Sequence, residues 1–153
     1  MCRRGIMDAT MALAPRVAID TNVVVAGLRS RTGASFRLLS AIGAGLFEIA
    51  LSVPLVLEYE DALARHAGVT GLSQADVDVV LDYFCRVGHL QEIFFLWRPY
   101  LPDPKDDMLL ELAIAAGCQM IVTHNVRDFV GVGRFGIETL PPGKFLVRIG
   151  ALT

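Results

Sequence analysis

Apolar and polar residues follow two alternating rhythms along the chain. Short apolar runs predict buried strands at 16–19, 47–51, 91–97, 119–123 and 137–140. Between these runs apolar residues recur at helical spacing, which predicts helices over 35–45, 54–66, 74–87 and 105–116. Strands that alternate with helices predict an α/β fold, with three α/β/α layers around a central, mostly parallel sheet of four to five strands.

Several positions carry local signals for the ends of these elements. Ser73, with Asp76 three residues later, predicts a capped helix start, and Pro54 suits a first helical turn. The proline-rich run 99–104 excludes regular structure. The polar stretch 124–130 predicts a turn or short helix, and 142–150 either a short helix or an extended tail.

The length of 153 residues predicts one domain over 15–153, preceded by a loose arm over 1–14. Hydrophobic residues make up 54% of the chain, enough to fill a core. No apolar run approaches the ~20 residues of a membrane span. The three cysteines are odd in number and widely spaced, which argues against a disulfide framework or zinc site. A cytoplasmic protein is expected.

The overall charge limits how the protein can bind nucleic acid. There are 14 basic and 16 acidic residues, giving a net charge of −2. Proteins that bind nucleic acid mainly through backbone charge are usually basic. Any nucleic-acid role must therefore depend on a local site.

Polar side chains gather where ligands bind in such folds, at the carboxyl ends of the strands. Asp20, Thr21 and Asn22 follow the first predicted strand, and Thr123 to Asn125 end the fourth. Two predicted helices begin at the same edge, and they add further carboxylates close to their starts. The residues expected to converge there are Asp20, Glu58, Asp107 and the pair Asn125 and Asp128.

Taken singly, these residues have ordinary structural interpretations. An aspartate at a strand end is often a turn residue, and Asp106 and Asp107 suit the positive end of a helix dipole. Together they form a set of hard oxygen ligands, which favours Mg²⁺ or Mn²⁺ over zinc. Such an ion can promote hydrolysis of a phosphodiester bond.

Other enzyme classes fit the sequence less well. A phospho-receiver domain needs an acceptor aspartate on a middle strand and a late lysine, and neither Glu48 nor Lys144 lies in the right place. A haloacid-dehalogenase-type phosphatase needs an aspartate where Asn22 stands. The sequence contains no Gly-x-Ser-x-Gly elbow, dinucleotide-binding glycine motif or P-loop.

Four segments, in this order, resemble the motifs of PIN-domain nucleases, and the closest branch is the small bacterial toxins of toxin–antitoxin pairs (VapC-like). They are the segments around Asp20 (20–26), around Glu58 (54–59), 103–113 and 122–129. The resemblance spans residues 16 to 147. It implies a three-layer PIN-like fold, dependence on Mg²⁺ or Mn²⁺, and cleavage of RNA within the strand.

Carried onto this chain, the resemblance implies metal-binding carboxylates at Asp20, Glu58 and Asp107. Asp106 is then expected to support the site or cap its helix. The fourth position departs from the family pattern, because Asn125 stands where many members have aspartate, and either Asn125 or Asp128 fills it. Thr21, Asn22 and Thr123 are expected to position the site or the phosphate.

The same resemblance implies partners. These are an RNA substrate, a cognate antitoxin protein that offers Arg or Lys to the acidic site, and a second copy in a homodimer. Apolar grooves beside 35–45 and 54–66 are expected to take hydrophobic side chains of the antitoxin. The alternative hypothesis is a catalytically weak PIN-like module that binds RNA or a partner without cutting.

Overall fold

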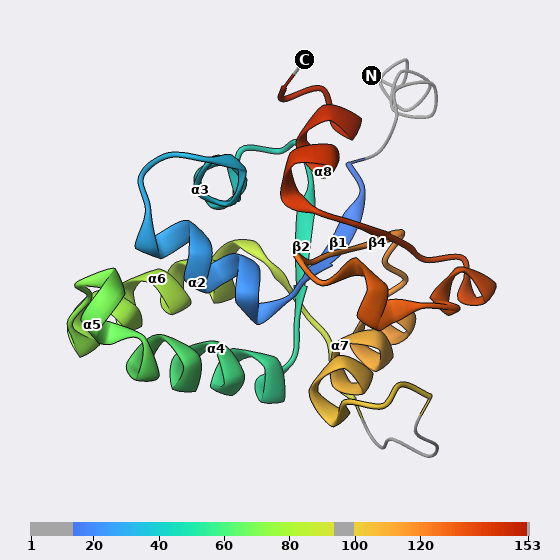
Figure 1. The fold of residues 1–153 in the computed structure, drawn as a ribbon, viewed down its shortest axis with the longest axis horizontal. Helices are drawn as coiled ribbons and strands as arrows, with labels where there is room; N and C mark the ends of the chain where they lie inside the picture. Colours follow the sequence, from blue (N-terminus) through green and yellow to red (C-terminus); the bar gives the residue numbers. More distant parts are fainter. Residues whose placement is uncertain (1–13, 94–99, 153) are drawn as a thin grey trace, which may run out of the picture.

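The computed structural model describes residues 14–93 and 100–152. Five strands form one parallel sheet in the order β3-β2-β1-β4-β5, with the first strand of the chain at its centre (Figure 1). The strands are β1 (Arg16–Ile19), β2 (Glu48–Leu51), β3 (His89–Leu90), β4 (Met120–Val122) and β5 (Glu138–Leu140). The predicted α/β/α fold with a parallel central sheet is confirmed.

Helices flank the sheet and connect its strands. Helix α3 packs against α2 and α8, α7 lies against β1, β2 and β4, and α4 contacts α2, α6 and α7. The helices are α2 (Thr21–Arg29), α3 (Ala34–Ala41), α4 (Val53–Arg65), α5 (Ala67–Thr70), α6 (Gln74–Val87), α7 (Pro104–Ala115) and α8 (Pro142–Arg148), with 3₁₀ turns η1 (Val126–Phe129) and η2 (Val132–Phe135).

The central strand explains why the first apolar run is continuous. Val17, Ala18 and Ile19 are almost fully buried, because β1 pairs with β2 on one side and β4 on the other and is covered on both faces. The register aligns Val17 with Ile49 and with Met120. The carboxyl ends of β1 and β4 therefore lie side by side, and the residues that follow these strands meet at one edge.

Pro54 and the Ser73–Asp76 pair correctly predict two helix starts, at α4 and α6. Ser52 accepts a hydrogen bond from the Leu55 N–H at the start of α4. Ser73 and Asp76 form a reciprocal capping box that begins α6. Both polar groups satisfy backbone donors that the first turn of a helix leaves without partners.

Two segments differ from the sequence prediction. The strand expected at 91–97 is wrong over 91–93, because β3 covers only His89–Leu90, while 94–97 lie outside the described residues. Its neighbour β2 ends at Leu51, whose carbonyl accepts the Gln91 N–H, and Ser52 then turns the chain into α4. Among the described residues, β2 therefore offers no strand partner beyond Gln91. No element was predicted for 21–29, where α2 buries three consecutive valines.

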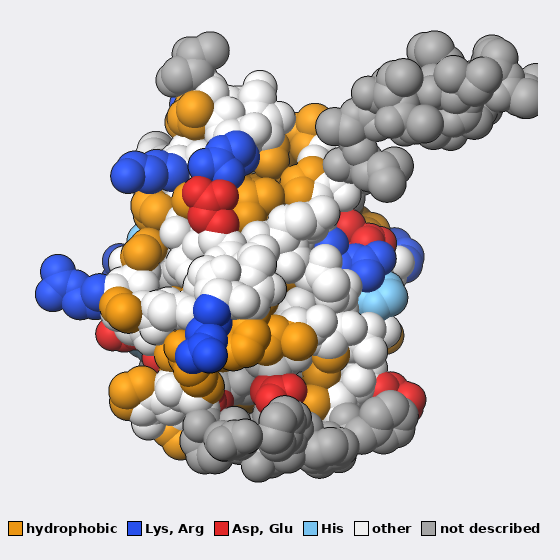
Figure 2. All heavy atoms as spheres, turned by 90° about the vertical axis from the view of Figure 1, so that its right-hand side faces the viewer, with side chains coloured by type: hydrophobic (Ala, Val, Ile, Leu, Met, Phe, Trp, Pro, Cys, Tyr) orange, Lys and Arg blue, Asp and Glu red, His pale blue; other side chains and the backbone are white. Residues whose placement is uncertain are grey.

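The outer surface carries charges of both signs. On the face shown in Figure 2, acidic and basic side chains are scattered among apolar and uncharged ones, without a broad basic patch. None of the helices within 14–93 and 100–152 has the length and apolar character needed to span a membrane. The face in this view gives a polyanion no extended electrostatic surface.

Candidate active site

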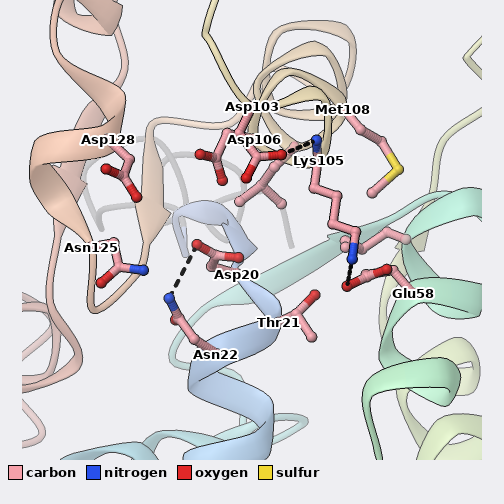
Figure 3. A pocket seen from close by; sticks show the side chains of 12 residues that line it. Asp20, Thr21, Asn22, Glu58, Asp103, Lys105, Asp106, Met108, Asn125 and Asp128 are labelled. Carbon is pink, nitrogen blue, oxygen red and sulfur yellow. Dashed lines mark hydrogen bonds and ion pairs between the residues drawn. The ribbon is translucent and has the colours of Figure 1, made fainter. Parts of the chain in front are cut away.

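A pocket of about 180 Å³ opens at the carboxyl edge of the sheet (Figure 3). Its wall combines the end of β1, the start of α2, the first turns of α4 and α7, and the segment after β4. The lining residues are Asp20, Thr21, Asn22, Leu55, Glu58, Asp103, Lys105, Asp106, Met108, Leu109, Asn125 and Asp128. We call this hollow the acidic pocket.

Asp20 lies at the centre of the acidic pocket and is held from the neighbouring strand. The Thr123 hydroxyl donates a hydrogen bond of 2.7 Å to Asp20 Oδ2, and Asn22 Nδ2 lies 3.4 Å from the same oxygen. Burial raises the pKa of Asp20, the hydrogen bonds from Thr123 and the Thr21 backbone lower it, and the charges of Asp128 and Asp103 raise it. The net shift is upward, so the ionised carboxylate lacks full compensation.

Thr123 does not line the acidic pocket, but its hydroxyl contacts residues that do. Its side chain is completely buried. The hydroxyl oxygen accepts hydrogen bonds from the Asn125 N–H at 3.0 Å and from Asn22 Nδ2 at 3.4 Å, while it donates to Asp20. One hydroxyl thus fixes the ends of β1 and β4 and the start of α2 relative to one another.

Glu58 enters the acidic pocket from α4, and its neighbour in the chain anchors that helix. The buried Tyr59 hydroxyl donates a hydrogen bond of 2.5 Å to the carbonyl of Ile19, the residue before Asp20. Burial, and then the charge of Asp20, raise the pKa of Tyr59 well above its usual value, so the hydroxyl keeps its proton. This bond ties the helix that carries Glu58 to the strand that carries Asp20.

The two adjacent aspartates of α7 point in different directions. Asp106 lines the acidic pocket, whereas Asp107 does not. The buried Asp107 carboxylate accepts hydrogen bonds from the N–H groups of Tyr100, at 3.0 Å, and Leu101, at 2.7 Å. Successive residues of a helix differ by about 100° in direction, so only one of the pair can face the pocket. Asp107 therefore holds the backbone of Tyr100 and Leu101, just before α7, rather than facing the pocket.

Lys105 is the one cation among the described residues that line the acidic pocket. Its ammonium lies 3.3 Å from Glu58 Oε2, and Arg65 approaches the same oxygen at 3.8 Å. Asp103 caps α7 by accepting a hydrogen bond from the Lys105 N–H, and its negative charge raises the pKa of Asp106. Glu58 is thus partly neutralised, while the carboxylates on the other side of the pocket are not.

The segment after β4 completes the wall. Asn125 and Asp128 both face the acidic pocket in Figure 3. Asp128 lies in the turn η1, and its charge raises the pKa values of Asp20 and Asp106. Both residues therefore occupy the region expected for the fourth motif, with Asp128 contributing the charge that Asn125 lacks.

The electrostatics fit a hard divalent cation. Of the described residues that line the acidic pocket, five are carboxylates and one is a lysine. Burial, followed by the charges of Asp20, Asp103, Asp128 and Asp107, raises the pKa of Asp106 to about 6. Within 14–93 and 100–152, no three acidic, His or Cys side chains are grouped tightly enough to hold an ion unaided. Mg²⁺ commonly uses one or two carboxylates, with water and substrate phosphate as its other ligands.

The structure therefore gathers most, not all, of the predicted site residues. Two lie outside the acidic pocket, namely Asp107, which anchors a loop, and Thr123, which orients Asp20. Sequence reasoning gave no role to Asp103 or Lys105, although both stand in the quoted third motif. The predicted residues that line the pocket are Asp20, Thr21, Asn22, Glu58, Asp106, Asn125 and Asp128.

Comparisons with known proteins show the family and the fold of the chain. The VapBC2 structure from Rickettsia felis, solved bound to a DNA fragment from its promoter, is similar over 81% of this chain and 98% of that chain. The identity is 15% and the TM-score 0.56, a likeness of fold. A search of curated proteins finds no match. The sequence profile of the PIN domain matches residues 16–127, which include β1, β4 and the four acidic motifs up to Arg127. The chain belongs to the PIN-domain family.

Proposed function

We propose that the protein is a metal-dependent endoribonuclease that hydrolyses RNA phosphodiester bonds at the acidic pocket. The observation that carries the proposal is the convergence of Asp20, Glu58, Asp106 and Asp128 on one pocket at the carboxyl edge of the sheet. These carboxylates come from four separate segments of the chain. Membership of the PIN-domain family and the resemblance of its motifs to those of ribonuclease toxins support RNA as the substrate.

Within this proposal Asp20 and Asp106 are the principal metal ligands, and Glu58 is a third. Asp106 takes the place that the sequence analysis gave to Asp107, because Asp106 lines the pocket and Asp107 is engaged by backbone N–H groups. Bound Mg²⁺ or Mn²⁺ would activate a water molecule and offset charge on the phosphate. Thr123 holds the Asp20 carboxylate, and Asn125 and Asp128 offer oxygens to water on the opposite wall.

In this proposal Lys105 occupies Glu58 until a metal ion binds. While no metal is bound, its ammonium neutralises Glu58, at a separation of 3.3 Å. A divalent ion that binds Glu58 competes with this contact. The lysine is largely exposed, so its long side chain can move toward an incoming phosphate.

The experiment is cleavage of a mixed single-stranded RNA by the purified protein in Mn²⁺, Mg²⁺ or EDTA, with Asp20→Asn as the inactive control. We expect cleavage in either metal and none in EDTA or in the variant. Equal cleavage by wild type and Asp20→Asn would contradict the proposed site. Metal binding without cleavage of any RNA would instead favour the binding-module hypothesis.

We further propose that the protein is the toxin of a toxin–antitoxin pair. The support is the likeness of fold to VapBC2 and the resemblance of the motifs. The antitoxin would place an Arg or Lys in the acidic pocket, where carboxylates outnumber Lys105. Induced expression in a bacterial host tests this idea: growth should stop with the wild type and continue with Asp20→Asn. Unimpaired growth with the wild type would count against a toxin. The homodimer remains a prediction from the sequence.

A further inference from the structure

A second hollow, of about 540 Å³, lies beside the acidic pocket along α2. Thr21 and Asn22 line both, so one end of this groove meets the metal site. We call it the cationic groove. Its lining residues are Thr21, Asn22, Val25, Ala26, Arg29, Ala62, Arg65, His66 and His124.

The cationic groove follows one face of α2 and is closed by the end of α4. The α2 residues recur at positions 21, 22, 25, 26 and 29, which is the spacing of a single helix face. Eight residues of rise carry this face about 12 Å away from the acidic pocket. A ligand in the groove can therefore extend outward from the reacting position.

The charge of this groove is opposite to that of the neighbouring pocket. Two arginines and two histidines line it, and none of the described residues in its wall is a carboxylate. Arg65 is partly neutralised by two carboxylates, Asp61 at 3.0 Å and Glu58 at 3.8 Å. Arg29, in the last turn of α2, makes no ion pair or hydrogen bond through its side chain with a residue that the structure describes. Arg29 thus supplies the guanidinium most available to a ligand.

The histidines add donors and flat rings. His66 Nδ1 contacts the Ala62 carbonyl at 2.8 Å, so that nitrogen donates and Nε2 is left for a ligand. His124 Nε2 lies 2.9 Å from the Ser35 hydroxyl, which leaves its Nδ1. Val25 and Ala26 form an apolar part of the wall. Cations, ring faces and apolar side chains together match a single nucleic-acid strand.

We propose that the cationic groove binds the backbone of the RNA strand next to the scissile bond and leads that strand into the acidic pocket. This inference depends on the proposed ribonuclease function. The acidic pocket repels phosphates, and the whole chain carries a net charge of −2. A polyanion therefore needs local cations beside the site, and Arg29 with Arg65 provides them.

The test compares two exposed arginines that each lie in the last turn of a helix. Arg29 ends α2 beside the groove. Arg86 precedes Val87, the last residue of α6, just before the amino end of β3 at the opposite edge of the sheet, and its guanidinium lies 5.9 Å from the centre of the Tyr83 ring. Both side chains are exposed. Arg29→Gln and Arg86→Gln remove the same charge, and Arg29→Lys keeps it. In an Asp20→Asn background, fluorescence anisotropy then measures binding of a labelled single-stranded RNA across a range of salt concentrations.

We expect Arg29→Gln to weaken RNA binding about tenfold and Arg29→Lys to restore part of the loss. The slope of log affinity against log salt should fall by about 0.7, the value for one lost phosphate contact on a single strand. Arg86→Gln should bind like its parent. In the active background, Arg29→Gln should raise KM and leave kcat unchanged.

If Arg29→Gln and Arg86→Gln bound RNA with equal affinity and equal salt dependence, the proposal that the cationic groove binds RNA would be overturned. If that result came with normal cleavage by the wild type, only the groove proposal would fail. If the wild type neither bound nor cut RNA, the proposed function would fail with it.

Discussion

Asp20 and Asp106 at the acidic pocket and Glu138 at the surface are in opposite electrostatic states. Glu138 pairs with Arg148 through two hydrogen bonds, and this contact lowers the pKa of Glu138. Asp20 and Asp106 are partly buried among like charges, and their pKa values are raised. The protein neutralises an acidic group at its surface but accumulates unpaired ones at one edge of the sheet. Such an imbalance lowers stability unless a cation relieves it, and it marks functional sites.

The adjacent residues Asp106 and Asp107 compare a carboxylate that lines the acidic pocket with one that is held by backbone N–H groups. Asp106→Asn removes a pocket charge, so cleavage should fall on the order of a hundredfold, while the metal-free protein should melt at a higher temperature. Asp107→Ala removes the acceptor for two buried N–H groups and should cost about 1–3 kcal/mol of stability. Cleavage rates and thermal melts of the two variants measure both effects. If Asp107→Ala were as stable as wild type but inactive, the two roles would be reversed.

The buried threonine tests how far positioning matters. Thr123→Val preserves the shape of the side chain but removes its hydrogen bond to Asp20. We expect a loss of about tenfold or more in Mn²⁺ affinity or cleavage, as for other residues that orient metal ligands. Thr139→Val is a matched control, because its buried hydroxyl has no hydrogen-bond partner among the described residues. Equal activity of the two variants would show that Asp20 does not need Thr123.

Lys105, at the edge of the acidic pocket, should oppose binding of the metal. Lys105→Met removes the cation that contacts Glu58 and keeps much of the side-chain length. Mn²⁺ should then bind a few times more tightly, because no ammonium competes for that carboxylate. Calorimetric titration at two salt concentrations measures the change. Unaltered or weaker Mn²⁺ binding would mean that Lys105 does not compete with the ion.

The smallest expected effect is a pH dependence of stability. The pKa of Asp106 is about 6 in the folded protein against 3.8 without perturbation, so the folded state binds this proton more tightly. The destabilisation is fully present above pH 6 and fades as the pH falls from 6 toward 4. The gain in melting temperature of metal-free Asp106→Asn over wild type should narrow over that window. A gap that widened toward low pH would contradict the raised pKa.

The sequence predicted most of the framework because burial leaves a simple pattern. Continuous apolar runs located β1 and β4, Pro54 located the start of α4, and the Ser73–Asp76 pair located the start of α6. The edge strand β3 was misplaced, since its length depends on where β2 ends. The sequence analysis did not predict helix α2, because its valines favour strands by propensity and tertiary burial overrides that preference.

The sequence predicted which segments form the site, but not which side chains of those segments face the acidic pocket. Strand ends and helix starts meet at one edge in any parallel sheet, so the grouping of Asp20, Glu58 and Asp128 followed from topology. Choosing between Asp106 and Asp107 required the rotation of α7, which residue spacing does not provide. The cationic groove also depends on which face of α2 turns toward α4.

The central claim, that the unbalanced carboxylates hold a divalent ion, is tested most directly by calorimetric titration of the metal-free protein with Mn²⁺. Wild type and Glu138→Gln should bind with equal affinity, because Glu138 lies in a surface pair. Asp20→Asn and Asp106→Asn should each bind at least about tenfold more weakly. If Asp106→Asn bound Mn²⁺ as tightly as wild type, the account of the acidic pocket as the metal site would be contradicted.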